Sequence, residues 1–317
     1  TIEGINLNDS TVSGAGLFGV LNKARIKNVS IKSFDLKASD TIGGLAGVAY
    51  NSTIDNCFTV DGSVEVLVRQ RVGGLIGLVD NTSILDCYSN AEVTATVSDW
   101  VDPGGLVGIA YNSIIERCFA SGVVTGKHAC GGLIGAGWGN VVNNCYTTGV
   151  INCSIAYAGL LMGAATSGDN SFNNCYSTAT LNVNAAYAHY SGFLGGAIGN
   201  SVITFNNCSV LGDGNGFVFA GYSNASSVII NLNNCSYSQS YVDNAVSLIY
   251  PNYTLVENGT HVVDPTENFV VYSSGIDKEP LFCVSYVDVD LSEGDIIQEG
   301  SLYKYILYIL YFYQYSF

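Results

Sequence analysis

The chain has 317 residues, 48% of them hydrophobic and 12% charged, a composition that supplies a large core and argues against intrinsic disorder. Its 37 glycines and 4 prolines show no strict period of three, which excludes collagen and a proline-rich stalk. The 11 basic and 26 acidic residues give a net charge of -15, and such a surface repels phosphate backbones and anionic lipid headgroups. We therefore expect no nucleic-acid partner.

Along the chain, the first structural signal is an internal repeat. A Gly-Gly-Leu-x-Gly unit, or a close relative, recurs every 25 to 33 residues, with final glycines at Gly19, Gly47, Gly77, Gly108, Gly135, Gly163, Gly196 and Gly221. An Asn-Cys-aromatic unit follows each one, with Val29 in place of the cysteine in the first repeat and then Cys57, Cys87, Cys118, Cys145, Cys175, Cys208 and Cys235. The chain is therefore an array of about eight repeats.

Each repeat predicts short β-strands. One apolar residue stands three positions before the cysteine, as at Ile54, and another stands six after it, as at Val93, with Gly, Asn, Asp and Ser between the segments. Such segments are too short and too closely spaced for helices. A propeller blade is the alternative, but it needs about 40 residues and four strands. We expect an all-β fold, a right-handed parallel β-helix of about eight coils.

The corners of the coils have their own residues. The glycine pair suits a corner because glycine permits positive φ and close approach of backbones. Asparagine before the cysteine, as at Asn56 and Asn144, suits a corner because it tolerates the left-handed region.

Charge predicts a domain boundary near residue 238. Residues 239–317 carry eleven acids and two lysines, whereas residues 1–238 carry 15 acids and 9 bases. We expect a repeat β-helix over residues 1–238 and an acidic, strand-rich segment over residues 239–317. This segment ends in an aromatic run, Tyr303–Phe317, which is too short for a membrane helix and is expected to form a strand. The strand would cap its own β-helix or join the next subunit; a truncated membrane anchor is the third alternative.

Two of the repeats carry a family resemblance. Gly73–Gly77 followed by Ser83–Ser89, and Gly104–Gly108 followed by Ile114–Phe119, resemble the GLUG repeat of microbial cell-surface and secreted proteins. The resemblance extends over about residues 14–238, in register with the repeat period. It implies an extracellular β-helical stalk or adhesin-like module and supplies no catalytic residues.

The repeated cysteines are interpreted as a stacked, inward row of small hydrophobic side chains with free thiols. A zinc site is disfavoured because such a row spaces its ligands along an axis. Cys153 is expected to be another packed position. Cys130 and Cys283 lie outside the row, and the pairing of all three is left open.

Two rows of side chains near the cysteines are candidate surfaces. The aromatic residues that follow the cysteines would face outward as a stripe that binds a sugar or a partner: Phe58, Tyr88, Phe119, Tyr146 and Tyr176. If the side chains instead alternate strictly from the residue three positions before the cysteine, the cysteines point outward and these rings point inward. The hydroxyl residues one position later, Thr59, Ser89, Thr147 and Ser177, are a weaker candidate for an ice-binding face, since Ala120 interrupts them.

Two kinds of modification or ligand site have sequence signatures. Asn-x-Ser/Thr sequons, the acceptors of N-linked glycans, occur at Asn8, Asn28, Asn51, Asn81, Asn152, Asn207, Asn224, Asn234, Asn252 and Asn258. Asp288, Asp290, Ser292 and Glu299 are spaced like the oxygen ligands of a calcium loop, although the glycine is one place too late. The alternative is a solvated acidic loop, and no other cofactor is expected.

The sequence therefore predicts an extracellular or cell-surface structural or adhesive β-helix, with a surface filament assembled through its ends and C-terminal strand as one form. Its expected partners are further copies of itself, head to tail, and a cell-surface glycan or protein, with no membrane span. No enzymatic activity is predicted, because no histidine has a nucleophile or carboxylate at a recognisable spacing. The alternative is a β-helix polysaccharide lyase or hydrolase, or a carbohydrate-binding module, and an enzyme would need carboxylates or Arg/Lys that converge on one face.

Overall fold

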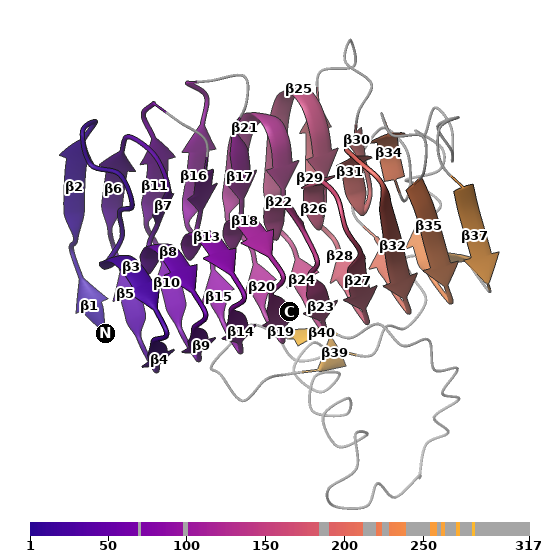
Figure 1. Cartoon of the computed structure of the whole chain (residues 1–317), viewed down its shortest axis with the longest axis horizontal. Coiled ribbons are helices and arrows are strands. Elements are labelled where there is room, and N and C mark those ends of the chain that lie inside the picture. Colours follow the sequence, from indigo (N-terminus) through magenta and orange to yellow (C-terminus); the bar gives the residue numbers. More distant parts are fainter. Residues whose placement is uncertain are drawn as a thin grey trace, which may run out of the picture.

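The protein is an elongated stack of short parallel β-strands (Figure 1). The computed structural model describes residues 1–68, 71–97, 101–183, 190–211, 220–223, 228–238, 254–258, 261–263, 271–272 and 281–282. Within these residues the regular structure is entirely strand. The fold is an all-β parallel β-solenoid, as predicted from the repeat.

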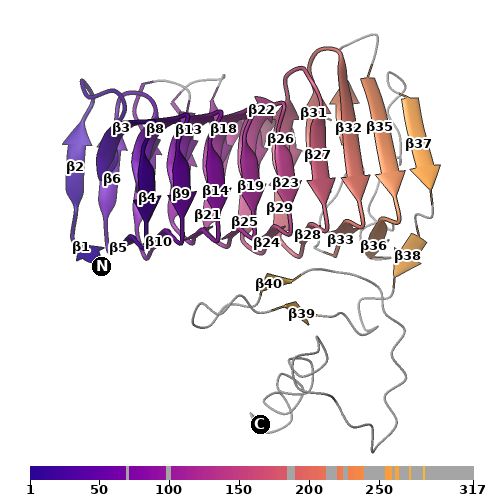
Figure 2. The ribbon, with the colours of Figure 1, turned by 60° about the horizontal axis from the view of Figure 1, so that its bottom comes forward.

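Each coil visits four sheets, which we call C, D, A and B in the order in which the chain meets them (Figure 2). Sheet C contains β3 (Phe18–Asn22), β8 (Ala46–Tyr50), β13 (Ile76–Asp80), β18 (Val107–Tyr111), β22 (Ile134–Trp138), β26 (Met162–Ala165), β31 (Leu194–Ala197) and β34 (Ala220–Ser223). Sheet D contains β4 (Arg25–Lys27), β9 (Thr53–Asp55), β14 (Ser83–Leu85), β19 (Ile114–Glu116), β23 (Val141–Asn143), β27 (Asn170–Asn173), β32 (Ser201–Asn206), β35 (Val228–Asn233) and β37 (Thr254–Asn258).

Sheet A contains β1 (Ile2–Glu3), β5 (Ser30–Lys32), β10 (Phe58–Val60), β15 (Tyr88–Ser89), β20 (Phe119–Ala120), β24 (Tyr146–Thr147), β28 (Tyr176–Ser177), β33 (Ser209–Val210), β36 (Ser236–Ser238) and β38 (His261–Val263). Sheet B contains β2 (Asn6–Asp9), β6 (Asp35–Ala38), β11 (Ser63–Val66), β16 (Glu92–Ala95), β21 (Val123–Gly131), β25 (Val150–Gly159) and β29 (Thr180–Val183), together with a second run, β7 (Ile42–Gly43), β12 (Arg71–Gly73), β17 (Asp102–Gly104) and β30 (Tyr190–Ser191). Outside these sheets, β39 (Val271–Tyr272) and β40 (Leu281–Phe282) form an antiparallel pair.

The repeats stack in the register that the sequence predicts. Ile54, Ile84 and Ile115, which stand three positions before a cysteine, are Cα partners on adjacent strands and are fully buried. Sheet C has eight strands, one for each predicted repeat, and about seven turns of the solenoid separate the first from the last.

Close backbone approach is what requires the glycine pair. A Cβ built on Gly105 would lie 2.1 Å from the carbonyl oxygen of Gly132 in the next coil. Of the two reasons that the sequence offers for the pair, close approach is the one that applies, since positive φ is found at other glycines, such as Gly139 and Gly168. In the seventh repeat the final glycine is Gly195, not Gly196, since Leu194 pairs with Met162.

The parallel stacking continues past the boundary expected at residue 238. Strand β37 pairs with β35, with Ile230 opposite Leu255, and β38 pairs with β36, with Tyr237 opposite Val262. The change in charge near residue 238 therefore does not mark the last coil.

Candidate functional site

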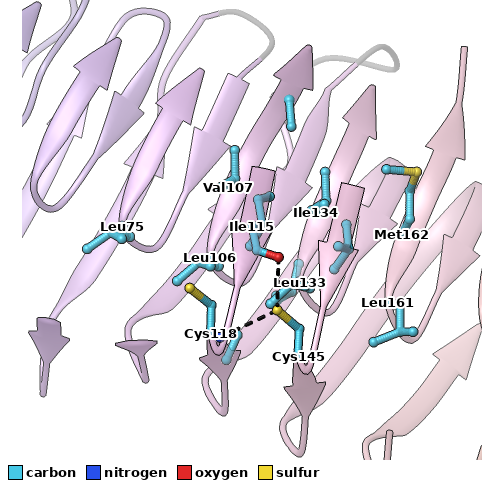
Figure 3. Close-up of a cluster of buried hydrophobic side chains, with 14 of the residues drawn as sticks. Leu75, Leu106, Val107, Ile115, Cys118, Leu133, Ile134, Cys145, Leu161 and Met162 are labelled. Atoms are coloured by element: carbon cyan, nitrogen blue, oxygen red, sulfur yellow. Dashed lines mark hydrogen bonds between the residues drawn. The ribbon is translucent and has the colours of Figure 1, made fainter. Parts of the chain in front are cut away.

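The repeated cysteines form one continuous row inside the solenoid. The backbone N–H of Cys118 donates to Sγ of Cys145 at 3.4 Å, and Sγ of Cys145 donates to the carbonyl oxygen of Ile115 at 3.5 Å (Figure 3). Cys57 and Cys87 repeat the first of these bonds with their neighbours at 3.4 and 3.3 Å. The prediction of an inward row of free thiols is confirmed for Cys57, Cys87, Cys118, Cys145, Cys175, Cys208 and Cys235.

The thiols of this row are enclosed, and their pKa values shift in both directions. Burial raises the pKa of the Cys87, Cys145 and Cys208 thiols well above the usual value. Hydrogen bonds with neighbouring thiols lower the pKa of Cys57 and Cys235 and, despite burial, also lower the pKa of Cys118 and Cys175. Enclosure therefore limits access of reagents and metal ions to the row. Cys130 and Cys153 are also free and buried.

The corner before each cysteine adopts the left-handed conformation that its asparagine predicts. The φ values are 59° at Asn28, 53° at Asn56, 52° at Asp86, 51° at Arg117, 53° at Asn144 and Asn174, 51° at Asn207 and 50° at Asn234. The side chains also stack: Nδ2 of Asn56 donates to Oδ1 of Asn28 at 2.6 Å. In the middle of the row Arg117 makes a two-pronged ion pair with Asp86, at 2.7 and 2.8 Å, in place of the amide contact.

The five predicted aromatic residues form a row of rings. Ring centroids are separated by 6.3 Å between Phe58 and Tyr88, 4.2 Å between Tyr88 and Phe119, 4.7 Å between Phe119 and Tyr146, and 5.2 Å between Tyr146 and Tyr176. The last three rings make a cluster separate from the main core. They are nevertheless buried, with exposed fractions of 6%, 0% and 2%, so the expectation of five exposed rings is wrong for these three. Phe58 and Tyr88 are the partly exposed members of the row.

The hydroxyl row lies inside the coil. Thr59 and Ser89 have no exposed surface, and Thr147 and Ser177 are 1% and 0% exposed. Since the residues of a strand alternate between two faces, an inward Thr59 places Phe58 on the outer face of sheet A. Buried hydroxyls cannot contact ice, so the ice-binding interpretation is wrong.

Most of the predicted sequon asparagines that the structure describes are exposed. Those with exposed asparagines are Asn8, Asn28, Asn51, Asn81, Asn207 and Asn234, whereas Asn152 is partly buried. Nδ2 of Asn81 donates to Oδ1 of Asn51 at 2.7 Å, so these two acceptors stack on neighbouring coils. Asn258 lies in β37, and the structure describes only its backbone.

Several predicted sites fall outside the described residues. They are the sequons Asn224 and Asn252, the thiol of Cys283, the calcium-loop residues Asp288, Asp290, Ser292 and Glu299, and the tail Tyr303–Phe317. Among the residues that the structure does describe, no three His, Cys, Asp or Glu side chains are grouped as metal ligands would be. The same part of the chain contains no helix long and apolar enough to cross a membrane.

Sequence reasoning did not anticipate a cluster where the second run of sheet B meets sheet C. Arg71 in β12 and Asp102 in β17 are Cα partners, and so are Tyr111 in β18 and Trp138 in β22. The two aromatic rings lie 3.9 Å apart at 31°. Nε of Arg71 is buried without a hydrogen-bond partner.

Burial dominates the electrostatics of this cluster. It raises the pKa of Asp102 to about 7, and the charge of Arg71 opposes the shift. Burial likewise raises the pKa of Tyr111, again against the effect of Arg71. These two side chains are brought together by packing between coils, and the spacing of a single repeat does not reveal it.

Comparison with known proteins supports the repeat class. Residues 69–94 and 102–125 match the family model described as "The GLUG motif", so the resemblance found in the sequence is confirmed for these two copies. The comparison with curated proteins found no match. Among solved structures, trypsin-treated QnrB1, a plasmid-mediated fluoroquinolone resistance protein, is similar at 11% identity with a TM-score of 0.25, over 82% of this chain and 92% of that one.

Proposed function

We propose that this GLUG-motif β-solenoid is an extracellular structural or adhesive protein that assembles through its ends into a surface filament. The observation that carries the proposal is the regular parallel stacking of the coils, in which the strands of sheets A, C and D pair from one coil to the next. A further coil can continue such a stack at a strand edge, because strand edges accept further strands unless they are covered.

Apolar side chains line the first coil of the described stack. Leu7 and Ile26 pack against the core but are only partly buried. Their partners in the next coil, Leu36 and Ile54, are 1% and 0% exposed. A further coil placed on the N-terminal end would bury these apolar side chains and satisfy the strand edges, and a second copy of the chain is the source that we propose.

Two features support a location outside the cell. GLUG repeats are commonly extracellular. The exposed sequon asparagines, such as Asn28 and Asn51, are suited to carry glycans in a secreted eukaryotic protein. The rings of Phe58 and Tyr88, which are partly exposed, offer an adhesive contact on the outer face of sheet A. The proposed role requires no catalytic chemistry.

A charge on the first described coil provides the test. Leu7→Lys places an ammonium group on the terminal face, whereas Asn6→Lys in the same strand places it at an exposed position and serves as the control. We expect the full chain and the control to form filaments under the electron microscope, and Leu7→Lys to remain monomeric by light scattering with an unchanged circular dichroism spectrum. A monomeric wild-type chain at high concentration, or filaments of Leu7→Lys, would refute assembly through this end.

Glycosylation tests the location separately. Native material should have a mass above 33.4 kDa that falls on glycosidase treatment. An unmodified mass would remove the sequons as support for a eukaryotic surface.

A further inference from the structure

The cluster of Arg71, Asp102, Tyr111 and Trp138 has a feature that the scaffold role does not explain. A buried polar atom in a folded protein normally has a hydrogen-bond partner, and the exceptions mark bound water, ions or ligands. Nε of Arg71 is such an exception. Arg71 also makes no ion pair with Asp102, although the two residues stand side by side on adjacent strands of the described chain.

Packing between the second run of sheet B and sheet C brings the strands of the four residues together. A Cβ on Gly108 would lie 2.8 Å from the backbone nitrogen of Val72, so the strand of Tyr111 passes the strand of Arg71 in close contact. One coil further, a Cβ on Gly135 would lie 2.6 Å from the carbonyl oxygen of Asp102, so the strand of Trp138 passes the strand of Asp102 in the same way.

In each of two successive coils, therefore, one polar residue and one aromatic residue lie on strands that pack against each other. Ile109 and Ala136, which precede the aromatic residues by two positions on the same face, belong to a small apolar cluster of which Tyr111 is a partly buried neighbour. Tyr111 and Trp138 themselves are partly exposed. A tilted aromatic pair thus lies on strands packed beside those of Arg71, whose Nε has no hydrogen-bond partner among the described residues, and of Asp102.

We infer that Arg71, Asp102, Tyr111 and Trp138 form a binding site for a neutral sugar ring, one unit of a polysaccharide or glycan. Neighbouring hydroxyl groups of a sugar are both donors and acceptors, so they can accept from Arg71 and donate to Asp102 at once. The apolar face of the ring suits an aromatic surface, and Tyr and Trp are the residues enriched in such contacts. This activity lies beyond the scaffold role and does not depend on filament assembly.

Charge favours a neutral sugar over an acidic one. Asp102 stands next to Arg71, and Asp80 is the Cα partner of Tyr111, so the single cation of the cluster has two carboxyl groups near it. The net charge of -15 also repels a polyanion. A carboxylate ligand would have to overcome both effects.

Binding measurements on the full chain test the site. The probes are soluble neutral oligosaccharides built from glucose, mannose, galactose or xylose, with oligogalacturonate as the acidic comparison, and the readout is calorimetry. We expect a neutral oligosaccharide to bind and Trp138→Ala to weaken it by roughly tenfold, because the stacking surface is lost. Asp102→Asn keeps the side-chain volume and removes a carboxylate acceptor, so it should also weaken binding.

Tyr50→Ala is the matched control. Tyr50 stands in the same row of sheet C, as the Cα partner of Asp80, and is 37% exposed, but it lies two coils away from Tyr111. Its loss should leave the affinity unchanged. Three results would overturn the inference: no binding of any neutral probe, equal loss in the control, or binding of oligogalacturonate alone that disappears in Arg71→Gln. Each variant must keep the wild-type circular dichroism spectrum, and Asp102→Asn tests the site if an aromatic variant does not fold.

Discussion

Gly105→Ala tests whether backbone contact between coils dictates the repeated glycine pair. The new Cβ would lie 2.1 Å from the carbonyl oxygen of Gly132 and 2.9 Å from Cβ of Ala120. No part of the effect comes from φ, because Gly105 is not among the residues with positive φ. The next coil must therefore move away by about 1 Å against a strand spacing of roughly 4.8 Å.

That movement strains the ladder around the new methyl group. The N–H of Gly105 donates to the carbonyl oxygen of Gly131 at 3.1 Å, and the N–H of Leu106 donates to that of Leu133 at 3.0 Å. Overpacking costs about 1–3 kcal/mol, and each weakened backbone bond adds about 1 kcal/mol. We expect the free energy of unfolding to fall by roughly 3–5 kcal/mol.

Urea unfolding followed by circular dichroism measures the loss. Hydrogen exchange at Leu106 and Leu133 then locates it, because solenoids open locally. Gly4→Ala is the control: its φ is +72° and nothing lies within 4 Å of the new Cβ, so only a backbone cost of about 1–2 kcal/mol is expected. A change of less than about 0.5 kcal/mol in Gly105→Ala, with unaltered exchange, would refute the reasoning.

Three further predictions concern the core, the corner and the buried acid. Cys118→Val should lower the free energy of unfolding by less than about 1.5 kcal/mol, because Val29 already occupies the equivalent position in the first repeat. In the wild type, peptide mapping should find Cys118 unlabelled by a thiol reagent until urea unfolds the chain. Labelling of the native protein would contradict the buried row. Arg117→Asn should change the free energy of unfolding by no more than about 1 kcal/mol in urea titrations, since the ion pair with Asp86 is partly exposed and an amide fits the row of corner asparagines. A loss above about 2 kcal/mol would contradict this. The pKa of Asp102 in the folded protein, about 7, exceeds its unfolded value, so the contribution of Asp102 to stability is complete at low pH and is lost as pH rises through 7. Between pH 4 and pH 8 the free energy of unfolding should therefore fall by roughly 2–4 kcal/mol more in the wild type than in Asp102→Asn. Parallel curves of stability against pH for the two proteins would contradict the shift.

The repeat made the fold predictable, because residues at the same position of each unit stack on one another. Ile54, Ile84 and Ile115 show this for the core. The left-handed corner was predictable as well, because the conformational preference of asparagine at Asn56 belongs to the residue itself.

The features that the sequence did not predict have a common physical cause. A strand of two or three residues has too few positions to reveal which of its side chains point inward. The inward direction of Thr59 depends on the corner at Asn56, which resets the alternation. Tyr146 stacks between rings of the two neighbouring coils, and the proximity of Arg71 to Tyr111 depends on contact between different coils. These features arise from packing, which no single repeat encodes.

Cryo-electron microscopy of filaments formed by the full chain tests the proposed assembly most directly. The account predicts that the strand ladders run on from one subunit to the next, with strands of the neighbouring copy lying roughly 4.8 Å from β1, β2, β3 and β4. Discrete solenoids whose N-terminal strand edges face solvent, or subunits joined only along their sides, would contradict it.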